Sequence, residues 1–133
     1  MPIVNEIPIN RADLARLYKN LGGEERLTQI LEAFYQRMAG DVLIGFFFAG
    51  KDLTLIALKQ KQFLMRAMGA APSYLGKPPA QAHTELAPIL PGHFDRRTQI
   101  LKETLRSHQV SEADIETWIG FEATFRSTIE KRD

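Results

Sequence analysis

Apolar residues in this chain of 133 residues recur at helical spacing, and no stretch alternates with a period of two for long. In the segment from about residue 24 to 39 they fall at i, i+3, i+4, i+7, i+8 and i+11, which is one face of an α-helix. These positions are Leu27, Ile30, Leu31, Phe34, Tyr35 and Met38. The pattern therefore predicts an all-α fold.

Capping residues and glycines predict where the other helices begin and end. One helix begins after Asn10 and stops at Gly22-Gly23, and another begins after the N-cap residue Asp52 and ends at Gly69. Further along the chain the sequence predicts a short helical turn at 80–86, a helix at 93–107 and a helix opened by Ser111.

Length and composition exclude several classes of protein. The chain fits one domain, residues 1–133 with 1–10 as an N-terminal extension, and 44% hydrophobic with 25% charged residues is typical of a soluble globular protein. A net charge of +1 without a Lys/Arg stripe gives no reason to expect a nucleic acid partner, and no apolar run approaches the roughly 20 residues of a membrane helix. The chain has no Cys, which excludes disulfides and thiolate chemistry, and its start lacks the features of a signal peptide. We expect a cytoplasmic protein.

The segment GFFFAGKD, residues 45–52, places three consecutive phenylalanines beside a turn. A helix buries one or two of three neighbours, and a strand exposes the middle one, so neither period accommodates Phe46, Phe47 and Phe48. The rings therefore raise the expectation of a flat apolar partner at the point where the chain turns.

Two polar side chains fall on faces that are otherwise apolar. Gln60 lies on the predicted buried face of the third helix, and Tyr35 lies on that of the second. A buried amide needs hydrogen-bond partners or destabilises the fold by about 1–3 kcal/mol. Either residue alone is explained by a place at the edge of its stripe, but together they indicate a polar spot inside an apolar pocket. The predicted face of the third helix is Leu53, Ile56, Gln60, Phe63, Leu64, Ala67 and Met68.

Of the three histidines, His83 has the most suggestive setting. It lies in the short helical turn between two loops rich in Pro and Gly, so its imidazole can be aimed into a pocket. The alternative is an ordinary surface or core histidine, and we interpret His93 and His108 as surface residues.

No other catalytic pattern is present. One interior histidine cannot form the ligand set of a zinc site, and H-E-x-x-H, G-x-S-x-G and Walker A motifs are absent from the sequence. Most Lys and Arg residues fall on polar helix faces, where we expect them to be solvated.

A series of short segments resembles the truncated haemoglobins, in the order and at the spacing of that family. The segments are LYKNLGGEE, AFYQRM, FFFAGKD, KQKQFLMRAMGAAPSYLG, AQAHTEL and GHFDRR, from Leu17 to about Arg97. The HFD triplet is similar to group I, and the Trp that group II carries at the start of the fourth helix is missing. The resemblance implies a truncated globin, a two-over-two helical sandwich around haem b.

The resemblance also assigns residues to the two sides of the haem. It implies that His83 is the proximal iron ligand and that Tyr35 and Gln60 are distal donors to a bound gas. Ile56 stands where many members have a polar distal residue or Leu, so one distal hydrogen bond is expected to be missing. Three roles stay open for Lys59: binding the iron from the distal side, pairing with a haem propionate, or simple solvation.

The remaining assignments concern the haem pocket walls. Phe48 resembles the phenylalanine that wedges against the porphyrin, with Phe47 beside it, and Phe63 and Tyr74 resemble wall residues. The segment TELAPILPG after the proximal histidine differs from the commoner family pattern.

The implied function is reversible binding of dioxygen, carbon monoxide and nitric oxide, with nitric oxide dioxygenation as a side activity served by an unknown reductase. The resemblance is compatible with a monomer or weak dimer. Two alternatives stay open: a hexacoordinate redox or peroxidase-like haem protein closed by Lys59, and a helical interaction module without haem.

Overall fold

The computed structural model describes residues 11–70 and 91–124, and within these ranges the chain forms five α-helices, one short 3-10 helix and no strand. The all-α prediction is confirmed for this part of the chain. The predicted extension at 1–10 and the short turn at 80–86 lie outside the described residues. The elements are α1 (Arg11–Leu21), α2 (Glu24–Ala39), η1 (Gly45–Phe48), α3 (Leu53–Ala67), α5 (Pro91–Ser107) and α6 (Glu112–Ala123).

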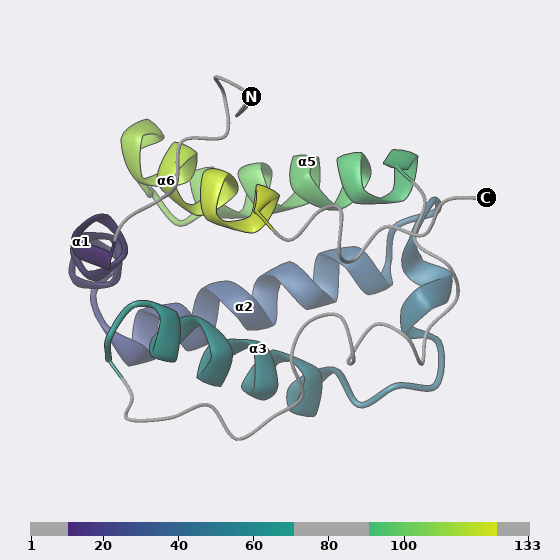
Figure 1. The fold of residues 1–133 in the computed structure, drawn as a ribbon. Helices are drawn as coiled ribbons and strands as arrows, with labels where there is room; N and C mark the ends of the chain where they lie inside the picture. Colours follow the sequence, from purple (N-terminus) through teal and green to yellow (C-terminus); the bar gives the residue numbers. More distant parts are fainter. Residues whose placement is uncertain (1–10, 71–90, 125–133) are drawn as a thin grey trace.

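The long helices form two stacked pairs, as predicted. α2 packs against α3 in one layer and α5 against α6 in the other, and the layers meet mainly where α2 contacts α5. Figure 1 shows the two layers, with α1 crossing one end of the sandwich. α1 contacts α6, α2 and α3, so it closes that end of the core.

The predicted caps form the helix ends that the structure shows. Asp52 accepts a hydrogen bond from the Leu55 amide at 3.1 Å, and Ser111 accepts one from the Asp114 amide at 3.1 Å. Gly22 and Gly23 have φ angles of +104° and +88°, a conformation that glycine adopts readily, and they separate α1 from α2. α5 begins two residues before the predicted start, because a proline is well suited to the first helical position.

The core is built on α2. All six residues of its predicted face are buried, and α1 adds Leu14, Leu17 and Leu21. Trp118 and Ile115 enter from α6, and Leu101 and Leu105 enter from α5. Burial of each large aliphatic side chain stabilises the fold by about 1.5–3 kcal/mol, so this shared core fixes the two layers against each other.

The buried face of α3 is only partly the predicted one. Ile56, Gln60 and Phe63 were expected in the core but are half-buried. At 3.6 residues per turn they form a row about a quarter of a turn away from the stripe that is fully buried. Ala57 was missed because a small side chain adds little to an apolar pattern. The buried stripe consists of Ala57, Leu64 and Met68.

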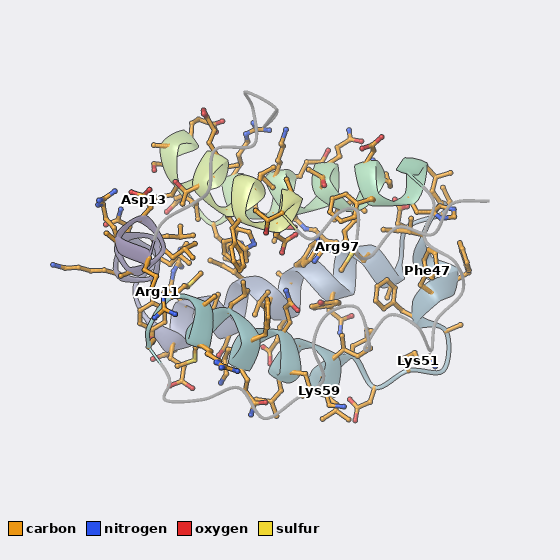
Figure 2. All side chains as sticks on the ribbon, in the orientation of Figure 1. Arg11, Asp13, Phe47, Lys51, Lys59 and Arg97 are labelled. Atoms are coloured by element: carbon orange, nitrogen blue, oxygen red, sulfur yellow. The ribbon has the colours of Figure 1, made fainter. Side chains whose placement is uncertain are left out.

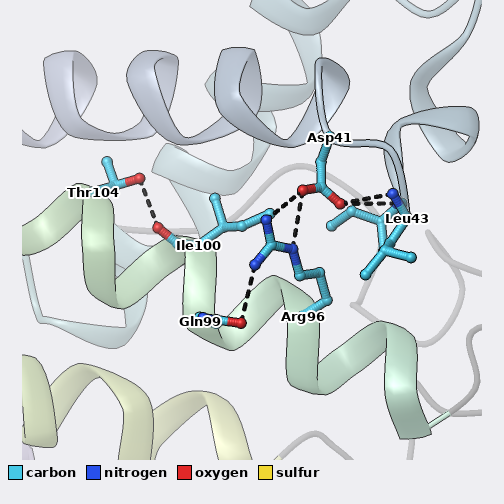
Figure 3. A network of polar contacts seen from close by, with 7 residues as sticks. Asp41, Leu43, Arg96, Gln99, Ile100 and Thr104 are labelled. Atoms are coloured by element: carbon cyan, nitrogen blue, oxygen red, sulfur yellow. Dashed lines mark hydrogen bonds and ion pairs between the residues drawn. The ribbon is translucent and has the colours of Figure 1, made fainter.

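An ion pair joins the end of α2 to α5. Arg96 donates two hydrogen bonds to Asp41 Oδ1, from Nη2 at 2.6 Å and from Nε at 3.0 Å (Figure 3). The Asp41 side chain is 7% exposed. The other carboxylate oxygen accepts from the amides of Leu43 at 3.0 Å and Ile44 at 3.2 Å. The hydrogen bonds from Arg96 hold the pKa of the Asp41 carboxyl below its ordinary value, and the two amides act in the same direction against burial.

Replacing Asp41 by Asn is expected to destabilise the protein in a pH-dependent way. A carboxyl whose pKa is lowered in the folded state stabilises it above the ordinary pKa of 3.8, and this contribution is lost as the pH falls through the folded pKa. Urea unfolding of both proteins should therefore show a clear difference in the free energy of unfolding at neutral pH, and this difference should disappear in acid once the pH falls below the folded pKa of Asp41. An equal difference in the free energy of unfolding at neutral and at acid pH would mean that Asp41 stabilises the fold through its shape rather than its charge.

Candidate functional site

The three consecutive phenylalanines occupy three different environments in η1. Phe46 is 54% exposed, Phe47 is buried in the core, and Phe48 is half-buried. The rings of Phe46 and Phe47 stack with centroids 4.1 Å apart. His93, predicted to be a surface residue, is instead half-buried, because the start of α5 brings its ring edge-on to both of them at 5.7 and 5.2 Å.

η1 is placed by a close backbone approach at its first residue. A Cβ on Gly45 would lie 2.6 Å from the Ala39 carbonyl oxygen, a distance that real Cβ atoms essentially never show. The absence of a side chain therefore lets the chain turn back over the end of α2. This turn brings Phe48 to Tyr35, with ring centroids 5.9 Å apart in an edge contact.

Tyr35 and Gln60 come from adjacent helices of one layer. Tyr35 is buried on α2, and Gln60 belongs to the half-buried row of α3 between Ile56 and Phe63. Phe63 stacks on Phe121 of α6, with centroids 6.2 Å apart. α2, η1 and α3 thus bring aromatic and aliphatic side chains together with one buried hydroxyl, on Tyr35, and one half-buried amide, on Gln60.

The other predicted site residues are either exposed or outside the described ranges. Lys59 is exposed on α3, and Figure 2 shows it on the outer side of that helix. Its role toward an iron stays a prediction. Tyr74 and His83 lie outside the described residues, so the proximal assignment also stays a prediction.

A buried ion pair near Tyr35 was missed by the sequence analysis, which expected Lys and Arg to be solvated. The side chains of Arg97 on α5 and Glu122 on α6 are 19% and 10% exposed. Arg97 donates to both carboxylate oxygens of Glu122, with Nη2 and Oε2 3.4 Å apart. Trp118 Nε1 donates to Glu122 Oε2 at 3.2 Å. Figure 2 shows Arg97 between the two layers of helices.

The surroundings of Arg97 are aromatic as well as charged. Its guanidinium carbon lies 5.1 Å from the ring centroid of Phe34 and 5.9 Å from that of Phe94. Burial by itself lowers the pKa of Arg97, but the negative charge of Glu122 and the hydrogen bonds that Arg97 donates to it, with a smaller contribution from Tyr35, outweigh burial and raise the pKa above its usual value. The group is a permanent cation.

A signal for this pair is present in the sequence. Arg97 lies three residues after Phe94 and four before Leu101, and both of these are buried. Glu122 lies four residues after Trp118, on the same face of α6. Each charge therefore falls on an apolar helix face, and two buried charges of opposite sign are expected to find each other.

Residues 11–70 and 91–124 contain no candidate membrane-spanning helix and no candidate cluster of metal ligands. No helix there is long and apolar enough to cross a membrane. Within the same ranges no three His, Cys, Asp or Glu residues cluster in a way that could hold a metal ion.

The comparison with known proteins identifies the family. The family model for bacterial-like globins matches residues 16–131. The chain belongs to the bacterial-like globin family. A group 1 truncated haemoglobin of Chlamydomonas moewusii is 33% identical over 100 residues, which make up 74% of this chain and 58% of that protein. A group 1 truncated haemoglobin of Synechocystis is 33% identical over 102 residues, covering 74% of this chain and 82% of that protein.

A solved structure supports the same assignment. The crystal structure of a truncated haemoglobin variant from Tetrahymena pyriformis in the Fe(III) form aligns with a TM-score of 0.80 and 26% identity, covering 87% of this chain and 98% of that one. The predicted truncated globin fold with its two-over-two helices is thus confirmed. The chain spans a little over half, 58%, of the Chlamydomonas protein.

Membership of the globin family implies that the chain binds haem. The described residues fit such a group. Ile56 and Phe63 of the half-buried row on α3 and Phe48 of η1 pack against the hydrophobic core, and Phe48 also meets the ring of Tyr35 edge-on. A porphyrin is a flat apolar ring system, and aromatic side chains provide large contact areas for it.

Proposed function

We propose that this globin holds haem b and binds dioxygen and other diatomic gases reversibly, with His83 as the residue that would bind the iron. The observation that supports the proposal is that Gln60 lies between the apolar Ile56 and Phe63 in the half-buried row of α3, while Tyr35 is buried on the adjacent helix α2. When bound, haem supplies an iron that coordinates the gas.

The side chains of this globin would decide what happens to the gas. A dioxygen molecule at the iron carries partial negative charge, and the Tyr35 hydroxyl and Gln60 amide are donors suited to that charge. Ile56 adds no donor at its position in the α3 row. Phe48 and Phe63 would contact the porphyrin and exclude water. Nitric oxide dioxygenation as a side activity, an unknown reductase, a monomeric or weakly dimeric state and a cytoplasmic location belong to the same proposal.

Absorption spectra of the purified protein test the proposal. We expect a strong Soret band in the ferric and ferrous protein that shifts when carbon monoxide is added. In the His83→Ala variant the band should be lost or altered, because the axial ligand is gone. His108→Ala is the matched control, since this half-buried histidine contacts the Thr104 carbonyl oxygen at a helix end, and its spectra should equal those of the parent protein.

Two outcomes contradict the proposal in different ways. If no haem binds even after reconstitution, the pocket interpretation is wrong. If haem binds but His83→Ala leaves every spectrum unchanged, another residue is the axial ligand.

A further inference from the structure

Within the described residues, the large hydrophobic side chains that stay exposed gather in one part of the chain. Val42 is 95% exposed, and the other four side chains are between 42% and 59% exposed. All five lie in the turn after α2, in η1 or in the first half of α3, and none lies on α1, α5 or α6. Figure 1 shows η1 at the end of the sandwich opposite α1. We call these five residues the apolar surface: Val42, Leu43, Phe46, Leu55 and Leu58.

The core and the candidate site do not account for the two exposed leucines of α3. At 3.6 residues per turn, Leu55 lies about half a turn from Leu64 of the buried stripe. By the same spacing, Leu58 lies about half a turn from Ile56 and Gln60 of the half-buried row. Leu55 therefore faces away from the core, and Leu58 faces away from the side of α3 that we assign to the haem.

The turn after α2 is held in place by contacts on its inner side. The Asp41 carboxylate is paired with Arg96 and accepts hydrogen bonds from the backbone amides of Leu43 and Ile44. The side chains of Ile44 and Phe47 are buried in the core. The exposed side chains beside them are therefore presented to the solvent by an anchored segment of the chain.

The charges that accompany the apolar surface are mostly positive. Between residues 42 and 67 the sequence has four basic residues and one acidic residue, a net charge of +3, whereas the whole chain has a net charge of +1. The acidic residue, Asp52, is the N-cap of α3, and α3 itself contains no Asp or Glu. Lys61 pairs with a glutamate of α2. The other three cations are exposed: Lys51, Lys59 and Arg66.

We propose that the apolar surface docks on an anionic lipid bilayer, with Val42, Leu43 and Phe46 entering the boundary between the headgroups and the acyl chains. The cations of α3 and of the loop before it contact the headgroups. Apolar side chains accompanied by Lys and Arg are typical of segments that lie in a membrane interface. The exposed parts of five side chains amount to roughly a few hundred Å², below the ~800 Å² that each partner buries in a standard protein interface. A stable dimer through this surface is therefore disfavoured.

The contact places the protein where its proposed ligands are concentrated. Dioxygen and nitric oxide are small apolar molecules, and apolar solutes transfer favourably from water into hydrocarbon. The docking itself does not depend on haem or on the proposed function, because the apolar surface and the cations belong to the chain.

Sedimentation of the purified full-length protein with lipid vesicles tests the inference. One set of vesicles is phosphatidylcholine alone, and the other has equal parts of phosphatidylcholine and phosphatidylglycerol. The apolar variant combines Val42→Ser with Leu43→Ser, two exposed positions at which a smaller polar side chain is compatible with the fold. Urea unfolding, followed by the fluorescence of Trp118, checks that every variant is folded.

A second pair of variants tests the charges. The charge variant combines Lys51→Gln with Arg66→Gln. Its matched control combines Lys19→Gln with Arg11→Gln, which removes the same two charges from exposed positions of α1 at the opposite end of the molecule.

We expect the parent protein to sediment with the phosphatidylglycerol vesicles and to bind phosphatidylcholine alone much more weakly. High salt should weaken the binding, because it screens the cations from the headgroups. The apolar variant should bind about 10-fold more weakly or less, since it removes the carbon atoms that enter the hydrocarbon boundary. The charge variant should bind about 10-fold more weakly, and its control should bind like the parent protein.

Other results overturn the inference. A parent protein that stays in the supernatant with both kinds of vesicle does not dock on lipid, and equal binding to both refutes the role of the anionic headgroups. Binding that the apolar variant retains in full, or that the α1 control weakens as much as the charge variant does, is unspecific attraction between charges. A dimer in analytical ultracentrifugation that the apolar variant abolishes assigns the surface to a second copy of the chain instead. A protein that binds the vesicles but no haem refutes only the proposed function.

Discussion

Replacing Tyr35 by Phe is expected to raise the dissociation rate constant of dioxygen by about 10- to 100-fold, since a hydrogen bond to a charged partner contributes about 1.5–3 kcal/mol. Phe preserves the edge contact with Phe48 and removes only the hydroxyl. Carbon monoxide carries little charge, so its release should change much less. Stopped-flow mixing of the oxygenated protein with a dioxygen scavenger and carbon monoxide measures the rate.

The matched control is Tyr18→Phe. Tyr18 lies on α1, outside the predicted ligand pocket, and packs against the same core. Its loss of a hydroxyl should leave the rate unchanged. If Tyr35→Phe likewise leaves the rate unchanged, Tyr35 has no distal role, even if haem binds through His83.

Replacing Glu122 by Leu is expected to lower the free energy of unfolding by about 3–5 kcal/mol, the range for removing one partner of a buried ion pair. The variant leaves the Arg97 cation in an aromatic environment without its carboxylate and the Trp118 N–H without its acceptor. Urea unfolding, followed by the fluorescence of Trp118, measures the change.

Two further variants locate the origin of that loss. Adding Arg97→Met to Glu122→Leu should recover much of the stability, since a buried ion pair replaced by apolar side chains is often tolerated. Glu112→Leu removes the carboxylate of an exposed pair with Arg106 and should barely move the unfolding midpoint. If Glu122→Leu lowers the free energy of unfolding as little as Glu112→Leu does, solvent screens the ion pair of Arg97 and Glu122.

The helices could be predicted because their signals are local. The face of α2 is one uninterrupted apolar stripe, and Asp52 and Ser111 offer their side-chain oxygens to amides three residues away. The residues that form each of these features lie close together in the sequence. Periodicity and capping therefore suffice to place the elements and to exclude a sheet in the described ranges.

The candidate site rests on residues that a family resemblance supplied, and their roles stay predictions. Nothing local shows that Gly45 must pass the Ala39 carbonyl, and this approach decides which of the three phenylalanines turns outward. The pairing of Arg97 with Glu122 joins residues 25 positions apart on two helices, so neither helix pattern alone reveals the partner. Such features depend on how the layers stack.

The geometry of α3 has a consequence for how this protein can diverge during evolution. Its buried stripe and its half-buried row are about a quarter of a turn apart, so stability and the proposed ligand chemistry would rest on different positions of the same helix. Under the proposed function, exchanges at Ile56 or Gln60 would alter which gas is retained while Ala57 and Leu64 keep the layer intact. A lineage carrying this helix can therefore explore new ligand preferences without first acquiring compensating changes in the core.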